Sequence, residues 1–139
     1  MTSSFLIFNR EPVSGGFLPL RLAASNGDFG GSTEASVFAD EFKFFADQLT
    51  TFPRTPGDKV LFSSGGDDEA WQSYLYLMAY ELDEQGRAAL QVRLRRNEPE
   101  PQAGGAAFTI QTTPAAIQGM GQALCAWLVS GEERLECSL

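Results

Sequence analysis

The strongest constraint on the fold of this chain is a long alternating stretch that turns back on itself. Residues 70–82 and 87–95 alternate with a period of two, which is typical of strands with one buried face. The residues between them end in Gly86, which can take a positive φ, so the sequence predicts an antiparallel hairpin. In 70–82 one face is expected to carry Trp71, Ser73, Leu75, Leu77 and Ala79, and the other Gln72, Tyr74, Tyr76, Met78 and Tyr80. In 87–95 the residues expected to point inward are Ala88, Leu90, Val92 and Leu94, and those expected to point outward are Arg87, Gln91, Arg93 and Arg95.

Shorter alternating or apolar segments predict further strands. One of them contains Pro19, which cannot donate a ladder hydrogen bond, so that strand is expected at a sheet edge or with the proline turned away from a partner. The glycine-rich residues 25–33 are expected to form a loop. The predicted strands cover residues 5–9, 17–23, 59–63, 106–111 and 135–139.

Two segments have helical periodicity. Phe38, Phe42, Phe45 and Leu49 recur at helical spacing, which predicts a helix over 34–50 capped by Ser32 or Thr33.

The pair Thr113-Pro114 predicts the start of a second helix over 114–129. Gly119 and Gly121 inside that helix each cost about 1 kcal/mol relative to Ala. We expect them to permit a close approach of the helix to an aromatic side chain or a strand.

These elements predict an α+β fold in one compact domain, residues 1–139. Strands joined by short turns favour antiparallel pairing, so we expect one antiparallel sheet of about five to seven strands. The two amphipathic helices are expected to pack on one face of it.

Charge and composition exclude several classes of function. The chain has 139 residues, a formal net charge of −8 and no histidine. The missing histidine removes the most common general base and metal ligand. The acidic balance argues against a nucleic-acid or anionic membrane partner and favours a basic protein partner. Cys125 and Cys137 lack metal-binding spacing, so we expect reduced, buried thiols in a cytoplasmic protein.

Few residues qualify as a site. The acids at 67–69 lack the spacing of a calcium loop, and no fingerprint of a phosphate-binding loop is present. We therefore expect no catalytic residue, no metal and no cofactor. The tyrosines of residues 74–80 either pair across strands under partial cover or form an interaction surface. The arginines of the return strand either face solvent or meet the acids of the first helix, Asp40, Glu41 and Asp47.

The order of these elements resembles the WapI-type immunity proteins of bacterial polymorphic toxin systems. The resemblance covers residues 38–129, and the Gly/Asp-rich stretch 63–69 departs from it. It implies a cytoplasmic protein that binds and neutralises a toxin domain and has no catalytic residues of its own. The matching features are the aromatic helix with Phe42, Phe45 and Leu49, the strand from Trp71 to Leu77, the turn 83–86, the strand 90–94, Phe108-Thr109-Ile110, and the helix with Ile117, Leu124, Trp127 and Leu128.

The sequence thus predicts a non-enzymatic acidic module that binds a protein, with an immunity protein as the first hypothesis. Aromatic groups beside carboxylates are the expected contact residues. A structural subunit that self-associates into a homo-oligomer through the aromatic strand face is the alternative, and a small-ligand carrier or unusual enzyme with its site between sheet and helices is a third. The predicted partner-binding residues are Asp67, Asp68, Glu69, Tyr74 and Tyr76.

Overall fold

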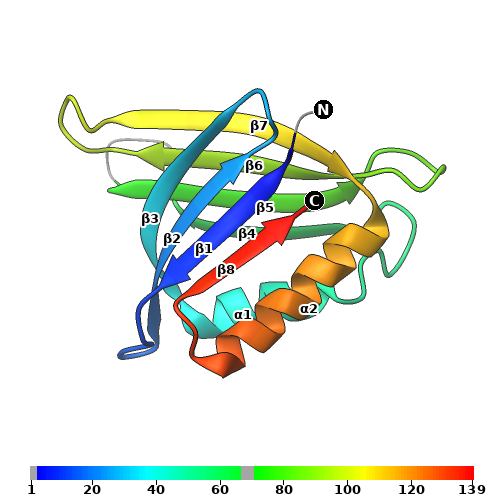
Figure 1. Ribbon diagram of the computed structural model, residues 1–139, viewed down its shortest axis with the longest axis horizontal. Coiled ribbons are helices and arrows are strands. Elements are labelled where there is room, and N and C mark those ends of the chain that lie inside the picture. Colours follow the sequence, from blue (N-terminus) through cyan, green and yellow to red (C-terminus); the bar gives the residue numbers. More distant parts are fainter. Residues whose placement is uncertain (1–2, 67–70) are drawn as a thin grey trace.

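The computed structural model describes residues 3–66 and 71–139, and this part of the chain forms strands and helices in an α+β arrangement (Figure 1). The elements along the chain are β1 (Phe5–Arg10), β2 (Phe17–Ser25), β3 (Gly30–Phe38), α1 (Ala39–Leu49), β4 (Lys59–Gly65), β5 (Ser73–Glu81), β6 (Ala88–Arg96), β7 (Gly104–Thr112), α2 (Pro114–Ser130) and β8 (Arg134–Ser138).

The strands divide into two antiparallel sheets of four. Sheet A has the order β3-β2-β1-β8 and sheet B the order β4-β5-β6-β7. The predicted α+β class is confirmed, but the single sheet of five to seven strands is wrong, because eight strands form two sheets that cross one over the other (Figure 1). Sheet A joins both ends of the chain, since β8 pairs with β1 and Leu6 lies opposite Cys137.

The segment before α1 differs most from the prediction. Residues 30–38, expected as a loop and the start of a helix, form β3, which pairs with β2 along its whole length. The helix begins only at Ala39, so Ser32 and Thr33 do not cap it. Phe38, expected on the buried stripe, is 55% exposed and stacks on Phe17 with a ring-centroid distance of 4.8 Å.

The proline in β2 shows how its strand tolerates a missing donor. β2 is an inner strand of sheet A, so the predicted edge position is wrong. The pairing of β1 with β2 ends at Arg10 and Leu20, one residue short of Pro19. Pro19 there only accepts a hydrogen bond, from the Glu11 amide at 3.1 Å, and no donor is required of it.

The helices lie side by side at one end of the crossed sheets (Figure 1). Phe42 of α1 connects the two sheets, because its ring centroid lies 6.1 Å from that of Phe8 in β1 and 5.2 Å from that of Phe62 in β4. Trp127 of α2 packs 6.0 Å from Phe8. Both sheets and both helices therefore share one apolar core, which is the main source of stability.

The glycines in α2 have different surroundings. At Gly121 a Cβ atom would lie 2.7 Å from Leu49 Cβ and 2.8 Å from the Thr50 nitrogen, whereas at Gly119 nothing lies within 4 Å. The predicted close approach exists at Gly121 only, and its partner is the end of α1 rather than an aromatic side chain or a strand.

Arg10 at the end of β1 fixes the end of α2. Its guanidinium donates to the carbonyl oxygens of Trp127 at 3.0 Å, Leu128 at 3.4 Å and Glu132 at 3.0 Å. The same group lies 4.8 Å from the centre of the Trp127 ring. A cation at the C-terminal end of a helix is also favoured by the helix dipole, so Arg10 is a structural residue.

Neither helix within the described ranges has the length and apolar character of a membrane-spanning helix.

Candidate functional site

The outer surface of sheet B carries the tyrosines that the sequence predicts as partner-binding residues. The inner surface of sheet B packs against β3 and α1 and holds the buried positions of its four strands except Ala89, which is buried on the outer side. The outward positions form four rows across the sheet, which we name the tyrosine–arginine face. These rows are Gly65, Tyr74, Arg95 and Gly105; Ser63, Tyr76, Arg93 and Ala107; Leu61, Met78, Gln91 and Thr109; and Lys59, Tyr80, Ala89 and Gln111.

The centre of this face is a contact network around Tyr76. The Arg93 guanidinium carbon lies 4.8 Å from the centre of the Tyr76 ring. The Tyr74 and Tyr76 rings are 6.1 Å apart, and the Tyr76 hydroxyl donates to the Met78 sulfur at 3.5 Å. These contacts limit the rotamers of the side chains, which lowers the entropy lost when a partner binds.

The three tyrosines of this face are half-buried, and Arg93 is exposed. The tyrosines thus pair across strands, as Tyr76 does with Arg93, and each is partly covered, whereas their role as an interaction surface stays a prediction. A half-covered tyrosine held by neighbours is the form that interface hot spots commonly take.

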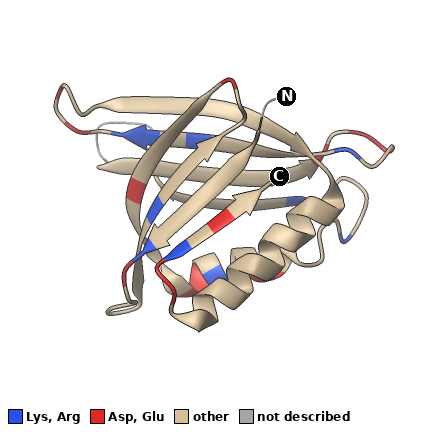
Figure 2. Ribbon diagram, in the orientation of Figure 1, with Lys and Arg blue, Asp and Glu red and all other residues tan. Residues whose placement is uncertain are grey.

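Charge on the tyrosine–arginine face differs from that of the chain. Its outward positions include Lys59, Arg93 and Arg95 and no aspartate or glutamate, although the chain as a whole has a net charge of −8. Figure 2 shows basic positions on β6, whereas many of the acids lie in turns. Tyr, Met and Arg are enriched in protein interfaces and acids are depleted, and the centre of the face shares these features.

The arginines of the return strand have local partners. Arg87 pairs with Asp83 in the turn before β6, and Arg95 donates to Asn97 at 2.7 Å. Asp47 of α1 pairs instead with Lys43 at 3.4 Å. The alternative in which this row meets the acids of α1 is therefore wrong.

The structure describes two of the five predicted site residues. Tyr74 and Tyr76 lie together on β5, whereas Asp67, Asp68 and Glu69 lie outside the described residues. The sequence analysis did not predict that Arg93 lies on the same face as Tyr76. The alternation of β5 and β6 was the signal that could have shown it. Trp71, expected on the inner face, precedes β5 and is 53% exposed, with its indole against Gly66.

The cysteines are free thiols, as predicted, but only Cys137 is fully buried. Burial raises the pKa of the Cys137 thiol to about 11. Partial burial and a hydrogen bond to Asp47 at 3.2 Å raise the pKa of the Cys125 thiol. Both shifts reduce the thiolate fraction, which is the nucleophilic form.

The acids with displaced pKa values are surface groups held by neighbours. The Cys125 thiol and Lys43 lower the pKa of Asp47, Arg54 lowers that of Asp58, and Arg87 lowers that of Asp83. A carboxylic acid that donates a proton needs a pKa displaced upward. These three acids are therefore displaced in the direction opposite to that of a general acid.

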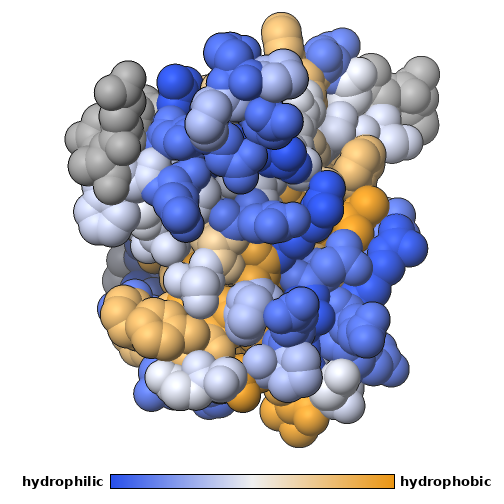
Figure 3. Space-filling view, turned by 90° about the vertical axis from the view of Figure 1, so that its left-hand side faces the viewer, coloured by the Kyte–Doolittle hydropathy of each residue, from blue (hydrophilic) through white to orange (hydrophobic). Residues whose placement is uncertain are grey.

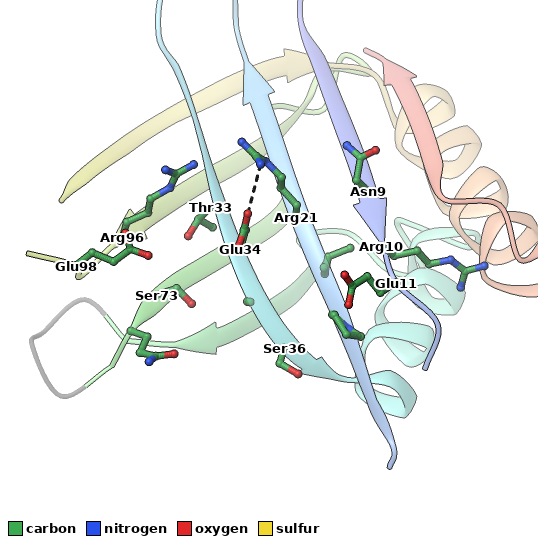
Figure 4. A pocket seen from close by; sticks show the side chains of 14 residues that line it. Asn9, Arg10, Glu11, Arg21, Thr33, Glu34, Ser36, Ser73, Arg96 and Glu98 are labelled. Atoms are coloured by element: carbon green, nitrogen blue, oxygen red, sulfur yellow. Dashed lines mark hydrogen bonds and ion pairs between the residues drawn. The ribbon is translucent and has the colours of Figure 1, made fainter. Parts of the chain in front are cut away.

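A cavity of about 550 Å³ beside β1, β2 and β3 is the second candidate (Figure 4). Its basic side chains already have partners: Arg21 pairs with Glu34 at 3.3 Å, and Arg96 donates to Ser32 at 2.8 Å. Arg10 points away toward α2. Because its arginines already have partners or point away, the cavity is a weaker candidate than the tyrosine–arginine face.

Comparison of the chain with protein-family models, with curated proteins and with solved structures finds no match.

Proposed function

We propose that this chain is a non-enzymatic protein-binding module and that the tyrosine–arginine face is its recognition surface. The observation that carries the proposal is the Tyr76–Arg93 contact at the centre of an outward sheet surface whose positions include no acid. Tyr and Arg are the residues on which binding energy concentrates in protein interfaces. The face is also pre-organised, because its strands are paired over their whole length.

The partner that we propose is a basic toxin domain, which makes this chain an immunity protein. The net charge of −8 would attract a basic domain over distance and increase its association rate, while the tyrosine–arginine face, whose own charges are basic, would contact an uncharged part of that domain. The acids Asp67, Asp68 and Glu69 precede β5 in the sequence and would contact the partner beside Tyr74 and Tyr76. The resemblance of residues 38–129 to immunity proteins of the WapI type supports the same assignment.

The absence of catalysis is part of the proposal. The raised thiol pKa values of Cys125 and Cys137 and the lowered carboxyl pKa values of Asp47, Asp58 and Asp83 support it. Each of these groups is stabilised in the form that is poorer for nucleophilic or acid catalysis.

The test begins by capturing the partner in cells with a photoreactive phenylalanine analogue in place of Tyr76. The same analogue in place of Phe29, which is 66% exposed in the turn between β2 and β3, is the control. A single protein cross-linked at position 76 and not at position 29 is then purified for calorimetry.

Tyr76→Ala and Arg93→Ala are each expected to weaken binding about tenfold to a hundredfold, as hot-spot truncations do. Phe29→Ala and Arg21→Ala, outside the face, are the matched controls and should leave affinity unchanged. Affinity that is unchanged in the first pair refutes the proposed surface. Unchanged affinity after charge reversal at Asp67, Asp68 and Glu69 removes these acids from the footprint.

Growth assays test the immunity assignment. The captured partner should arrest growth when produced alone, and the wild-type chain should relieve the arrest while Tyr76→Ala/Arg93→Ala should not. A harmless partner refutes that assignment but leaves the binding surface intact.

Self-association through the same face is the alternative function. Sedimentation would then show a stable homo-oligomer that Tyr74→Ala and Tyr80→Ala dissociate.

A further inference from the structure

A groove between α1 and β4 adjoins the tyrosine–arginine face and shares Leu61 and Ser63 with it. Its volume is about 420 Å³, and its walls are formed by Phe44 from the helix and Leu61 and Ser63 from the strand. The side chain of Phe62, only 5% exposed, contributes its floor. The groove therefore has an apolar interior.

Two large apolar side chains of this groove face solvent. Phe44 is 63% exposed and Leu61 is 50% exposed. Phe42 and Phe45, on the other side of α1, are buried in the core, so the amphipathic pattern of the helix does not account for Phe44. Figure 3 shows that hydrophobic surface gathers in the lower half of the molecule, at the level of α1 in Figure 1, below a hydrophilic upper half.

The rim of the groove is acidic. Asp40 and Glu41 lie four and three residues before Phe44, so all three share one side of the helix. Among the described residues, neither acid takes part in an ion pair or a side-chain hydrogen bond, unlike Asp47 later in the same helix. The helix dipole favours acids in the first turn, but it does not cancel their charge. Both carboxylates can therefore still pair with a cation of a partner.

We infer that this groove binds a segment of a partner protein that carries a large apolar side chain flanked by lysine or arginine. The apolar side chain would displace water between Phe44 and Leu61, and the flanking cations would pair with Asp40 and Glu41. Charge complementarity selects this occupant, because an acidic segment would be repelled by the rim and by the chain as a whole. Leu61 also belongs to the tyrosine–arginine face, so one partner can extend from that face into the groove.

The test uses two blocked peptides, Gly-Lys-Lys-Leu-Lys-Lys-Gly and the same peptide with Glu in place of each Lys. Amide signals of the isotopically labelled chain are followed by NMR during titration. The lysine peptide should give saturable shifts at Phe44, Leu61 and Ser63 that weaken with salt, and the glutamate peptide should give none.

Variants test which residues of the groove bind the lysine peptide. Phe44→Ala is expected to weaken binding of the lysine peptide about tenfold, and Asp40→Asn with Glu41→Gln about threefold to tenfold. Val129→Ala, which removes a side chain that is 84% exposed on α2, is the matched control and should have no effect. All these positions are exposed, so the variants should fold like the wild type.

Three outcomes overturn the inference. These are saturable shifts with both peptides, shifts confined to other regions, and shifts at the groove that depend on the concentration of the chain without peptide, which would mean that a second copy fills it. Arg93→Ala separates this inference from the proposed function, because no residue of β6 lines the groove and the variant should leave peptide binding unchanged.

Discussion

Adding one methyl group at Gly121 and one at Gly119 tests how closely the two helices pack. A Cβ atom at Gly121 would lie 2.7 Å from Leu49 Cβ, 2.8 Å from the Thr50 nitrogen and 2.9 Å from the Leu49 carbonyl carbon. Ordinary contact begins near 3.4 Å, so α2 would have to move away from α1 by about 0.5–0.7 Å. Two of the three atoms are backbone, and no rotamer change can relieve the overlap.

The expected free-energy changes have opposite signs. Overpacking of a core costs about 1–3 kcal/mol, and the higher helix propensity of Ala recovers about 1 kcal/mol. Gly121→Ala should therefore lower the free energy of unfolding by up to about 2 kcal/mol. Gly119→Ala meets open space and should raise it by up to about 1 kcal/mol.

Urea denaturation followed by far-UV circular dichroism measures both changes, with an unchanged m-value as the check on two-state behaviour. In thermal unfolding, the two variants should differ in Tm by up to roughly 12 °C, given a difference of up to about 3 kcal/mol and about 4 °C per kcal/mol for a chain of 139 residues. If Gly121→Ala stabilises the chain as much as Gly119→Ala, the helices do not meet at Gly121 and the packing described here is wrong.

Further predictions concern the end of α2, its start and a buried thiol. Arg10→Met removes the cation that binds the last carbonyls of α2 and should lower the free energy of unfolding by about 2 kcal/mol in urea denaturation. Arg21→Met, the control in an exposed ion pair, should lower it by less than about 0.5 kcal/mol. Equal losses for the two variants would contradict the capping role of Arg10. Thr113→Ala removes the side-chain acceptor of the Ala116 amide and should cost about 1 kcal/mol, and no loss would show that the cap is dispensable. The pKa of Cys137 is raised from its ordinary value of 9.0 to about 11, so the unfolded chain binds fewer protons than the folded chain between these values. Stability should fall by up to about 2–3 kcal/mol as the pH rises from 9 to 11, and Cys137→Ala should flatten this part of the profile; a profile unchanged by the substitution would refute the shift.

Segments with a strong local period were predicted well. The hairpin expected over 70–82 and 87–95 is present as Ser73–Glu81 and Ala88–Arg96, and the helix expected over 114–129 is Pro114–Ser130. In each case the period, the turn or cap and the apolar face indicate the same structure. Local signals that agree with one another are sufficient for such elements.

The placement of the tyrosines of the candidate site could be predicted from the sequence. The position of Tyr74 and Tyr76 on one side of a strand follows from the period of two. Whether that side is covered by another layer does not follow from it. The contact of Tyr76 with Arg93 needed the register of β5 against β6, which fixes the two residues as direct partners.

The strand β3 could not be predicted from its own residues. Gly30 and Gly31 have low strand propensity, and of the next residues only Thr33 and Val37 are buried. The strand is stabilised by contacts with distant parts of the chain: it pairs with β2, Thr33 donates to the Arg95 carbonyl oxygen at 2.9 Å, and Gly31 packs against Ala106.

The sequence by itself determined where the regular hairpin and the second helix form and which of their sides are apolar. The division into two sheets, the joining of β8 to β1 and the position of the helices at the end of both sheets were decided by the tertiary structure. The physical reason is that alternation records only the presence of an apolar neighbour on one side. The identity of that neighbour depends on packing between residues far apart in the chain, such as Phe8 with Phe42 and Trp127.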